Sequence, residues 1–176
     1  SLLDLQTQQY KLMAESYERN NMRNPFPLDR FSTEVYHMRC EDRTEIPIES
    51  SMAAIQAMER WKMVVSRQTL DSHVNETVER WYFRHDKIMD FFLVQEFMDR
   101  EELWENHLDD PRFRGVYFLL AYKLDYHTAM LLRERLIQHA ADSKDHSLSD
   151  NFVQILRSRK KPKKVSSREL KSEIQQ

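Results

Sequence analysis

Glu34, His37 and Cys40 are residue types that bind metal ions, and they lie close together in the sequence. Glu34 and His37 form a Glu-x-x-His pair, whose members project to the same side of a helix. Di-iron helical bundles need two such pairs and two further glutamates, and the sequence has no second copy. His37 and Cys40 share the same spacing, but two ligands do not make a structural zinc site. We therefore expect a surface glutamate and a half-buried histidine here, and no bound metal.

A second candidate metal site starts from the adjacent residues His85 and Asp86. All-helical metal-dependent phosphohydrolases hold a divalent ion with one histidine, a His-Asp pair on a helix and a later aspartate. In this chain the candidates for the remaining ligands are His37, His73, Asp90 and Asp125. Side chains at neighbouring helix positions point ~100° apart, so His85 and Asp86 need not share a site and also fit two polar surface residues of a long helix. The phosphohydrolase is kept as the alternative hypothesis.

Other catalytic machinery is missing from the sequence. Phosphate-cradling loops, dinucleotide turns and nucleophile elbows need glycine, and Gly115 is the only glycine in 176 residues. Cys40, the single cysteine, has no neighbouring catalytic group beyond His37. We interpret one cluster of carboxylates as a solvated face rather than a cation site: Glu101, Glu102, Glu105, Asp109 and Asp110. The sequence thus predicts a protein that is not an enzyme and that has no cofactor.

The elements that must position these residues are predicted to be α-helices. The chain is poor in turn formers, with one glycine and five prolines, while 40% of its residues are hydrophobic. We therefore expect an all-α fold of seven to nine helices, in which Gly115 lies in a connection. The length suits a single domain, residues 1–157, that buries roughly 70% of the surface of the unfolded chain.

Apolar residues recur at helical spacing along most of the chain. The strongest pattern runs from Leu70 to Ile88 and predicts a helix that starts at Ser66 or Thr69. It continues into residues 89–98, which are apolar nearly all round and are expected at the centre of the domain. The other predicted helices are 2–17, 28–38, 52–62, 100–108, 113–124, 126–141 and 148–156.

Aromatic side chains exceed what a minimal helical core needs, so they are the best candidates for a binding surface. Trp81, Tyr82 and Phe83 are consecutive, and successive helix residues point ~100° apart. At least one of them should therefore meet another helix or another chain. We predict protein partners bound through an apolar helical surface or groove, with a homodimer as one form. The candidate partner-binding residues are Trp81, Tyr82, Phe83, Trp104, Tyr117 and Tyr122.

The C-terminal segment, residues 158–176, is predicted to be a basic tail or linker, disordered or helical. Residues 157–176 hold eight basic and two acidic residues, which leaves 19 basic and 27 acidic residues and a net charge of −8 on the rest. An acidic body repels DNA, so nucleic acid is expected to contact only this tail or a domain outside the chain. The tail residues that suit a nuclear import signal or phosphate contacts are Arg159, Lys160, Lys161, Lys163 and Lys164.

Charge and hydropathy also bear on location. The longest uncharged hydrophobic run, residues 115–122, is far shorter than the ~20 residues that cross a bilayer, so no membrane partner is expected. The single cysteine suits a reducing compartment. We predict a nuclear location because of the basic tail, with the cytoplasm as the alternative.

Three stretches, in order, resemble the homology domain of telomere-repeat-binding factors. Pro47-Ile48-Glu49-Ser50 opens an apolar helix as Pro-Leu-Glu-Ser does in that family. Glu101-Glu102-Leu103-Trp104, followed by Asp109-Asp110-Pro111, is similar to an acidic helix of the family that ends in Asp-Pro. Ser149-Asp150-Asn151-Phe152-Val153-Gln154-Ile155-Leu156-Arg157 is similar to its closing helix.

The resemblance implies a helical domain that self-associates through a helix face and docks short peptides in a groove. In that family a separate Myb-like domain binds DNA, and this chain does not contain one. The family's docking residues have no defined counterparts here. The leading hypothesis is a non-enzymatic interaction module, a dimerisation or peptide-docking scaffold of a nuclear complex at telomeres or chromatin.

Overall fold

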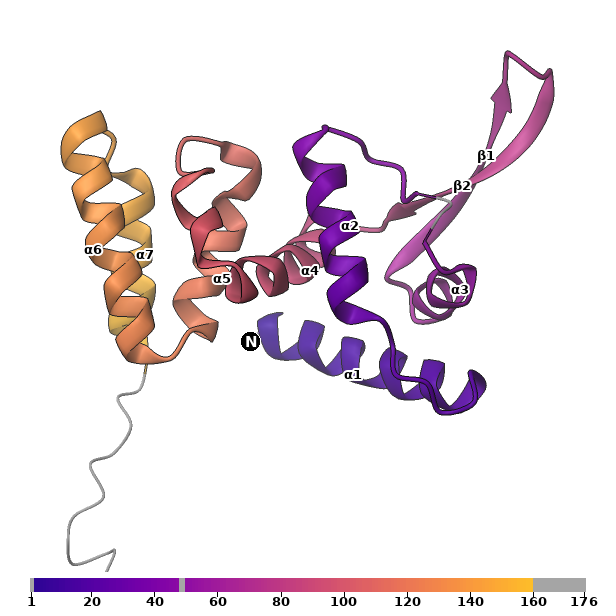
Figure 1. Cartoon of the computed structure of the whole chain (residues 1–176), viewed down its shortest axis with the longest axis horizontal. Helices are drawn as coiled ribbons and strands as arrows, with labels where there is room; N and C mark the ends of the chain where they lie inside the picture. The colour runs from indigo at the N-terminus through magenta and orange to yellow at the C-terminus, as the bar shows by residue number, and fades with distance from the viewer. Residues whose placement is uncertain (1, 48–49, 160–176) are drawn as a thin grey trace, which may run out of the picture.

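The computed structural model describes residues 2–47 and 50–159, which form helices and one β-hairpin (Figure 1). The elements, in chain order, are α1 (Leu2–Asn20), α2 (Leu28–Cys40), α3 (Met52–Arg60), β1 (Val64–Asp71), β2 (Glu76–Phe83), α4 (Asp86–Asp99), the 3₁₀ helices η1 (Glu101–Glu105) and η2 (Pro111–Phe113), α5 (Arg114–Lys123), α6 (Tyr126–Ser143) and α7 (Ser147–Ser158). Helices α6 and α7 stand side by side at one end of the molecule, and the hairpin projects from the other (Figure 1).

Local sequence signals explain where several helices begin. The Ser51 hydroxyl accepts a hydrogen bond from the backbone N–H of Ala54 and caps α3. The Asp125 carboxylate caps α6 in the same way, accepting from the backbone N–H of Thr128 at 2.9 Å. Two prolines, at 25 and 27, separate α1 from α2. The prediction was an all-α fold, and its helical part is confirmed by α1 to α7.

Helix α4 forms the centre of the hydrophobic core. It packs between α2 and α5, so it is buried on nearly every side. The Phe92 ring meets Phe31 of α2 edge-to-face, with centroids 4.8 Å apart, and the Phe97 ring meets Tyr117 of α5 at 5.8 Å. The prediction that residues 89–98 lie at the centre is confirmed, except that Met98 is 39% exposed.

The predicted helix from Ser66 to Ile88 is wrong, because residues 64–83 form an antiparallel hairpin. Strands β1 and β2 pair in register from Val64 opposite Phe83 to Asp71 opposite Glu76. The segment is rich in β-branched and aromatic residues, which favour strands. Towards the turn, the less exposed positions of β1 are Thr69 and Asp71, whereas the apolar Leu70 and Val74 are 67% and 58% exposed. The apolar residues there do not mark a buried strand face, and they recur at helical spacing instead. The fold is therefore mostly helical rather than all-α.

The hairpin turns through residues 72–75, which include no glycine. Asn75 adopts the left-handed conformation, with φ of 52°, and the Asp71 carboxylate accepts a hydrogen bond from the backbone N–H of His73 at 2.9 Å. Asparagine and aspartate thus supply the turn chemistry. Across the described residues, those with positive φ are Met22, Arg23, Asp42, Lys62, Asn75 and Lys144.

Gly115 lies inside α5 rather than in a connection, contrary to the prediction. A methyl group added at Gly115 would collide with the carboxylate of Asp90 on α4. The glycine therefore allows α4 and α5 to approach closely around a side chain. Residues 101–105, predicted as part of an α-helix, form the short 3₁₀ helix η1. Among the described helices, none has the length and apolarity that a membrane crossing requires.

Candidate functional site

Strand β2 separates the three consecutive aromatic residues onto two faces. Side chains alternate along a strand, so Trp81 and Phe83 share one face and Tyr82 occupies the other. Phe83 lies against Phe31 and Phe92 with centroid distances of 6.0 and 5.8 Å. The Trp81 indole packs against the core and donates a hydrogen bond to Glu59 Oε2 at 3.1 Å. Tyr82 is therefore the aromatic residue of the three that is turned away from the core.

Tyr82 lines an open hollow of about 490 Å³ between β2 and the connection from α2. The connection is fixed to β2 because the backbone N–H of Ile46 donates to the Trp81 carbonyl at 2.8 Å, and Glu45 pairs with Tyr82 as an isolated bridge. Arg43, Arg80 and Pro47 also line the hollow. We call this region the Tyr82 hollow.

Charged groups surround the Tyr82 hollow. The Arg67 guanidinium carbon lies 5.5 Å from the centroid of the Tyr82 ring, a cation–π distance. Arg80 stands directly opposite Arg67 in the hairpin and donates to Glu45 Oε2 at 3.1 Å, with Asp71 Oδ2 at 3.9 Å. These contacts offset the repulsion between the two arginines.

Trp104 and Tyr117, predicted as partner-binding residues, lie in the core. Both are at most 2% exposed. The Trp104 indole donates to the Phe97 carbonyl at 2.8 Å, and the Tyr117 hydroxyl donates to the Trp104 carbonyl at 2.6 Å. The two side chains therefore join η1 to α4 and α5 and present no surface to a partner. Tyr122, on α5, is 48% exposed and lies on a different element from the Tyr82 hollow.

The structure does not bring the His-Asp metal candidates together. His85 and Asp86 are exposed at the start of α4, His73 is exposed at the hairpin turn, and Asp125 caps α6. Asp90 is partly buried beside Gly115, and burial raises its pKa to about 6. Within residues 2–47 and 50–159, no three His, Cys, Asp or Glu side chains are placed to share a metal ion.

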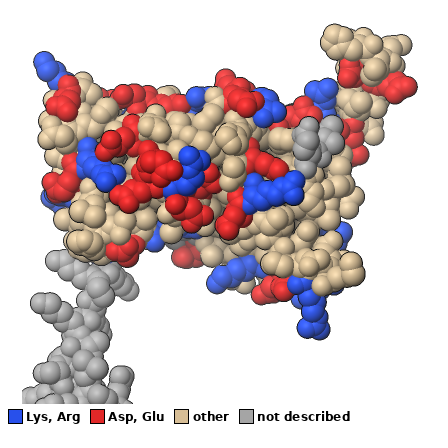
Figure 2. All heavy atoms as spheres, in the orientation of Figure 1, with Lys and Arg blue, Asp and Glu red and all other residues tan. Residues whose placement is uncertain are grey.

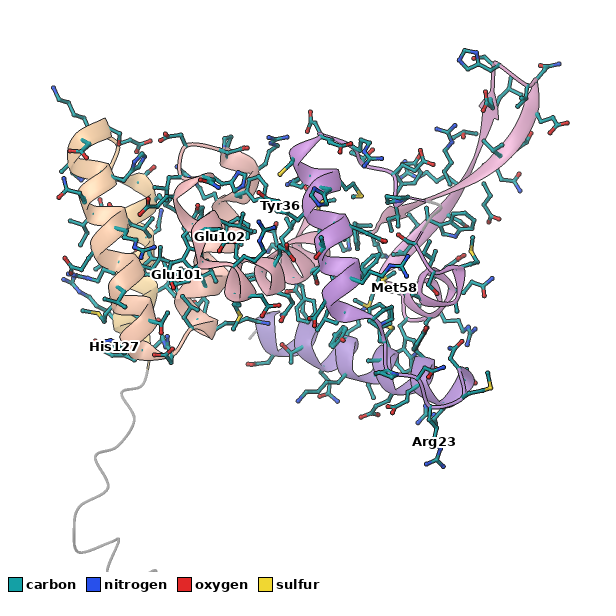
Figure 3. The ribbon with its side chains drawn as sticks, in the orientation of Figure 1. Arg23, Tyr36, Met58, Glu101, Glu102 and His127 are labelled. Atoms are coloured by element: carbon teal, nitrogen blue, oxygen red, sulfur yellow. The ribbon has the colours of Figure 1, made fainter. Side chains whose placement is uncertain are left out.

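The remaining metal candidates belong to α2. His37 and Cys40 are exposed there, and His37 is thus not the half-buried histidine that was expected. Glu34 accepts a hydrogen bond from the Ser50 hydroxyl at 2.5 Å. The neighbouring Tyr36 points toward η1 (Figure 3) and its hydroxyl lies 2.7 Å from His107 Nε2. Tyr36 and Glu34 therefore make structural contacts between elements.

The acidic cluster is paired with basic side chains, two of them on α6. Arg135 lies 3.0 Å from Glu101 and 3.8 Å from Glu105, and His139 Nε2 lies 2.7 Å from Asp109. Glu101 and Glu102 mark this face in Figure 3, and Figure 2 shows acidic and basic side chains interleaved across it. Glu102 and Asp110 pair with the nearby Arg100 and Arg112. Spacing along one helix could not predict these partners, because α6 lies thirty residues further on.

Arg159 is attached to the body of the molecule. Its guanidinium donates to the carbonyls of Ala121 and Leu124 at 3.0 and 2.7 Å, which completes the C-terminal end of α5. The guanidinium is therefore occupied by the fold, whereas the prediction assigned it to import or phosphate contact. The other residues of that prediction, Lys160, Lys161, Lys163 and Lys164, lie outside the described residues.

Comparison with known proteins found no matching family model, no matching curated protein and no matching solved structure. The likeness to telomere-repeat-binding factors thus stays a prediction from short motifs.

Proposed function

We propose that this protein is a non-enzymatic interaction module that binds a protein partner at the Tyr82 hollow. The observation that carries the proposal is the orientation of Tyr82, which faces away from the core into an open concavity with two arginines. Tyrosine and arginine are enriched among the residues that contribute most to protein–protein binding. The turn end of the hairpin projects clear of the helices (Figure 1), and Tyr82 lies nearer its base, opposite Val65.

The edges of the hairpin add to this support. The hairpin is a two-stranded sheet, and a partner strand could pair with it because strand edges carry unpaired N–H and C=O groups. The interaction surface proposed here is thus a hairpin face, whereas the sequence had suggested a helical one.

We also propose that the protein acts in the nucleus, as part of a telomere or chromatin complex. The support is the lysine-rich segment, residues 160–164, and the motif likeness described above. Expression of the chain with and without residues 160–176 fused to a fluorescent protein tests the location. Equal nuclear enrichment of both fusions would contradict the import role of that segment.

The Tyr82→Ala substitution tests the interaction. We expect recovery of bound proteins from a nuclear extract to fall by about tenfold or more, since central aromatic residues dominate interface energies. Tyr126→Ala is the matched control, because Tyr126 is a 40% exposed tyrosine on α6, away from the hairpin. Thermal unfolding of both variants should match the original chain.

Light scattering distinguishes a second copy from a different partner. If the occupant is a second copy, the original chain is a dimer and Tyr82→Ala is a monomer. If it is another protein, both are monomers and only the capture is lost. Unchanged capture and unchanged mass in Tyr82→Ala would contradict the proposal.

A further inference from the structure

A groove of about 350 Å³ lies where α1, the end of α3 and the start of α4 meet. Leu5 and Ile88 form apolar parts of its lining, and Lys62, Arg84, His85 and Lys87 supply its basic groups. None of these residues lines the Tyr82 hollow. We call this region the basic groove.

Three segments line the groove, and two of them, Lys62 and residues 84–87, carry its basic groups. Gln9 of α1 donates to the Trp61 carbonyl at 2.7 Å, and so fixes α1 to the end of α3. Lys62 turns the chain with φ of 58°, and the backbone N–H of Arg84 donates to the Met63 carbonyl at 3.0 Å. His85 then begins α4 in an extended conformation. The positive charges therefore converge although they are distant in sequence.

The basic groove has more basic than acidic side chains in its lining, although the charge of Lys87 also acts on Asp90 of α4. Within residues 2–47 and 50–159, none of the four basic side chains forms an ion pair within 4 Å. The acidic residues next to it in sequence are Asp4 and Asp86, and neither lines it. His85 provides no side-chain cap for the first N–H groups of α4, of which the Ile88 N–H donates to the His85 carbonyl at 3.0 Å. Asp86 in the first turn offsets part of the positive charge at this helix end.

An apolar lining inside a basic rim is complementary to a peptide that carries both apolar and acidic side chains. Leu5 is 69% exposed, so an apolar side chain placed beside it would remove that surface from water. Carboxylates beside this anchor would meet lysine and arginine, and one of them could accept from the free N–H groups of α4. The basic and apolar lining therefore favours a peptide with acidic and apolar side chains as the ligand of the basic groove.

Nucleic acid and membranes fit the basic groove less well. Its lining contains no Trp, Tyr or Phe on which a base could stack. A long polyanion or an anionic bilayer would extend beyond four basic residues onto a body whose net charge is −8 without residues 157–176. A short acidic segment avoids that repulsion.

We propose that the basic groove binds a short acidic segment of another protein, anchored by an apolar side chain. The proposal assigns a second binding site with its own ligand chemistry, separate from the Tyr82 hollow. Failure at one site therefore leaves the other proposal standing.

Selection of random displayed peptides of about twelve residues against the full chain tests the proposal. We expect the selected peptides to combine Asp and Glu with Leu, Ile, Phe or Met. A selected peptide, made with a fluorescent label, is then titrated against the chain by fluorescence anisotropy. Its affinity should fall as NaCl rises to about 0.3 M, because salt screens exposed charges.

Two double variants with the same change in net charge locate the binding site. Lys62→Glu with Arg84→Glu should weaken peptide binding about tenfold or more. Arg19→Glu with Arg23→Glu, placed near the other end of α1, should leave it within about twofold; Arg23 points away from the body there (Figure 3). Leu5→Ser, which keeps every charge, should weaken binding through the apolar contact.

Several results would overturn the proposal. They are selected peptides without excess acidic residues, no selected peptide at all, and equal weakening by both double variants. Stronger binding to phosphatidylcholine vesicles with about 30% phosphatidylserine than to any peptide would assign the groove to membranes instead. Circular dichroism melts check that each variant folds.

Discussion

Asp90 carries a partly buried carboxyl group that the fold solvates poorly. Its Oδ1 atom has no hydrogen-bond partner among the described residues. Burial raises the pKa of Asp90 to about 6, although the positive charge of Arg39 acts in the opposite direction. In the folded protein the Asp90 carboxyl group is therefore mainly protonated below about pH 6 and mainly ionised above it.

This pKa predicts how stability changes with pH. The folded pKa lies above the unfolded value of 3.8, so the folded state holds the proton more tightly, and stability is lost as pH rises from about 4 through 6. Asp90→Asn should raise the free energy of unfolding by about 1–3 kcal/mol near pH 8, with little gain below about pH 4. Urea unfolding across this pH range measures the difference.

Asp99→Asn is the matched control for this prediction, because Asp99 is an exposed aspartate on the same helix. Its effect on stability should vary little with pH. A destabilised Asp90→Asn protein near pH 8 would show that the buried carboxylate makes a favourable contact with its surroundings.

At the level of elements, the contact between α4 and α5 depends on Gly115. Alanine at this position gains helix propensity of about 1 kcal/mol, but its methyl group collides with the Asp90 carboxylate. We expect Gly115→Ala to destabilise the protein by about 1–2 kcal/mol, since the neighbouring carboxylate is held by packing.

A double-mutant cycle isolates the cause. In an Asp90→Ala background the collision is absent, so Gly115→Ala should become neutral or stabilising by about 1 kcal/mol. Equal effects of Gly115→Ala in both backgrounds, measured by urea unfolding, would rule out the contact with Asp90.

The hairpin and α4 show which parts of the fold can be predicted from the sequence. The apolar run at 89–98 predicts a central helix because burial on all sides leaves little choice of pattern. The hairpin is harder to predict because the apolar Leu70 and Val74 near its turn are exposed and do not mark a buried face. The strand preference of Val64, Val65 and Tyr82 is then the better signal.

The candidate site could be predicted only in part. If residues 81–83 are known to form a strand, the middle aromatic residue, Tyr82, must face the opposite side from Trp81 and Phe83, because side chains alternate along a strand. Residue types alone do not separate it from Trp104 or Tyr117, which the core covers. The basic groove leaves no motif, because α1, Lys62 and Arg84 meet only in three dimensions.

At the level of the whole molecule, Arg159, just after the end of α7, is bonded to another helix. Its two bonds tie the end of α7 to the end of α5. Hydrogen bonds from a charged donor contribute about 1.5–3 kcal/mol, less where water has access. We expect Arg159→Ala to lower the free energy of unfolding by about 1–2 kcal/mol.

Arg157→Ala is the matched control for this interaction. Arg157 is exposed and lies on α7, two residues before Arg159. The Arg157→Ala substitution therefore removes the same charge as Arg159→Ala. It should change stability by less than about 0.5 kcal/mol in urea unfolding. Equal losses in the two variants would mean that charge, rather than the bonds to α5, explains the effect.

The left-handed turns limit how much mutation this protein tolerates. Six of the described residues other than glycine have a positive φ angle. Each of them lowers the free energy of unfolding by roughly 1 kcal/mol relative to glycine at the same position. The hydrophobic core must offset this backbone strain. The net free energy of unfolding is then smaller, and fewer destabilising substitutions elsewhere can be tolerated. A lineage that acquired glycine at Lys144, where α6 ends, would gain a reserve. That reserve would let the Tyr82 hollow and the basic groove diverge toward new partners while the fold persists.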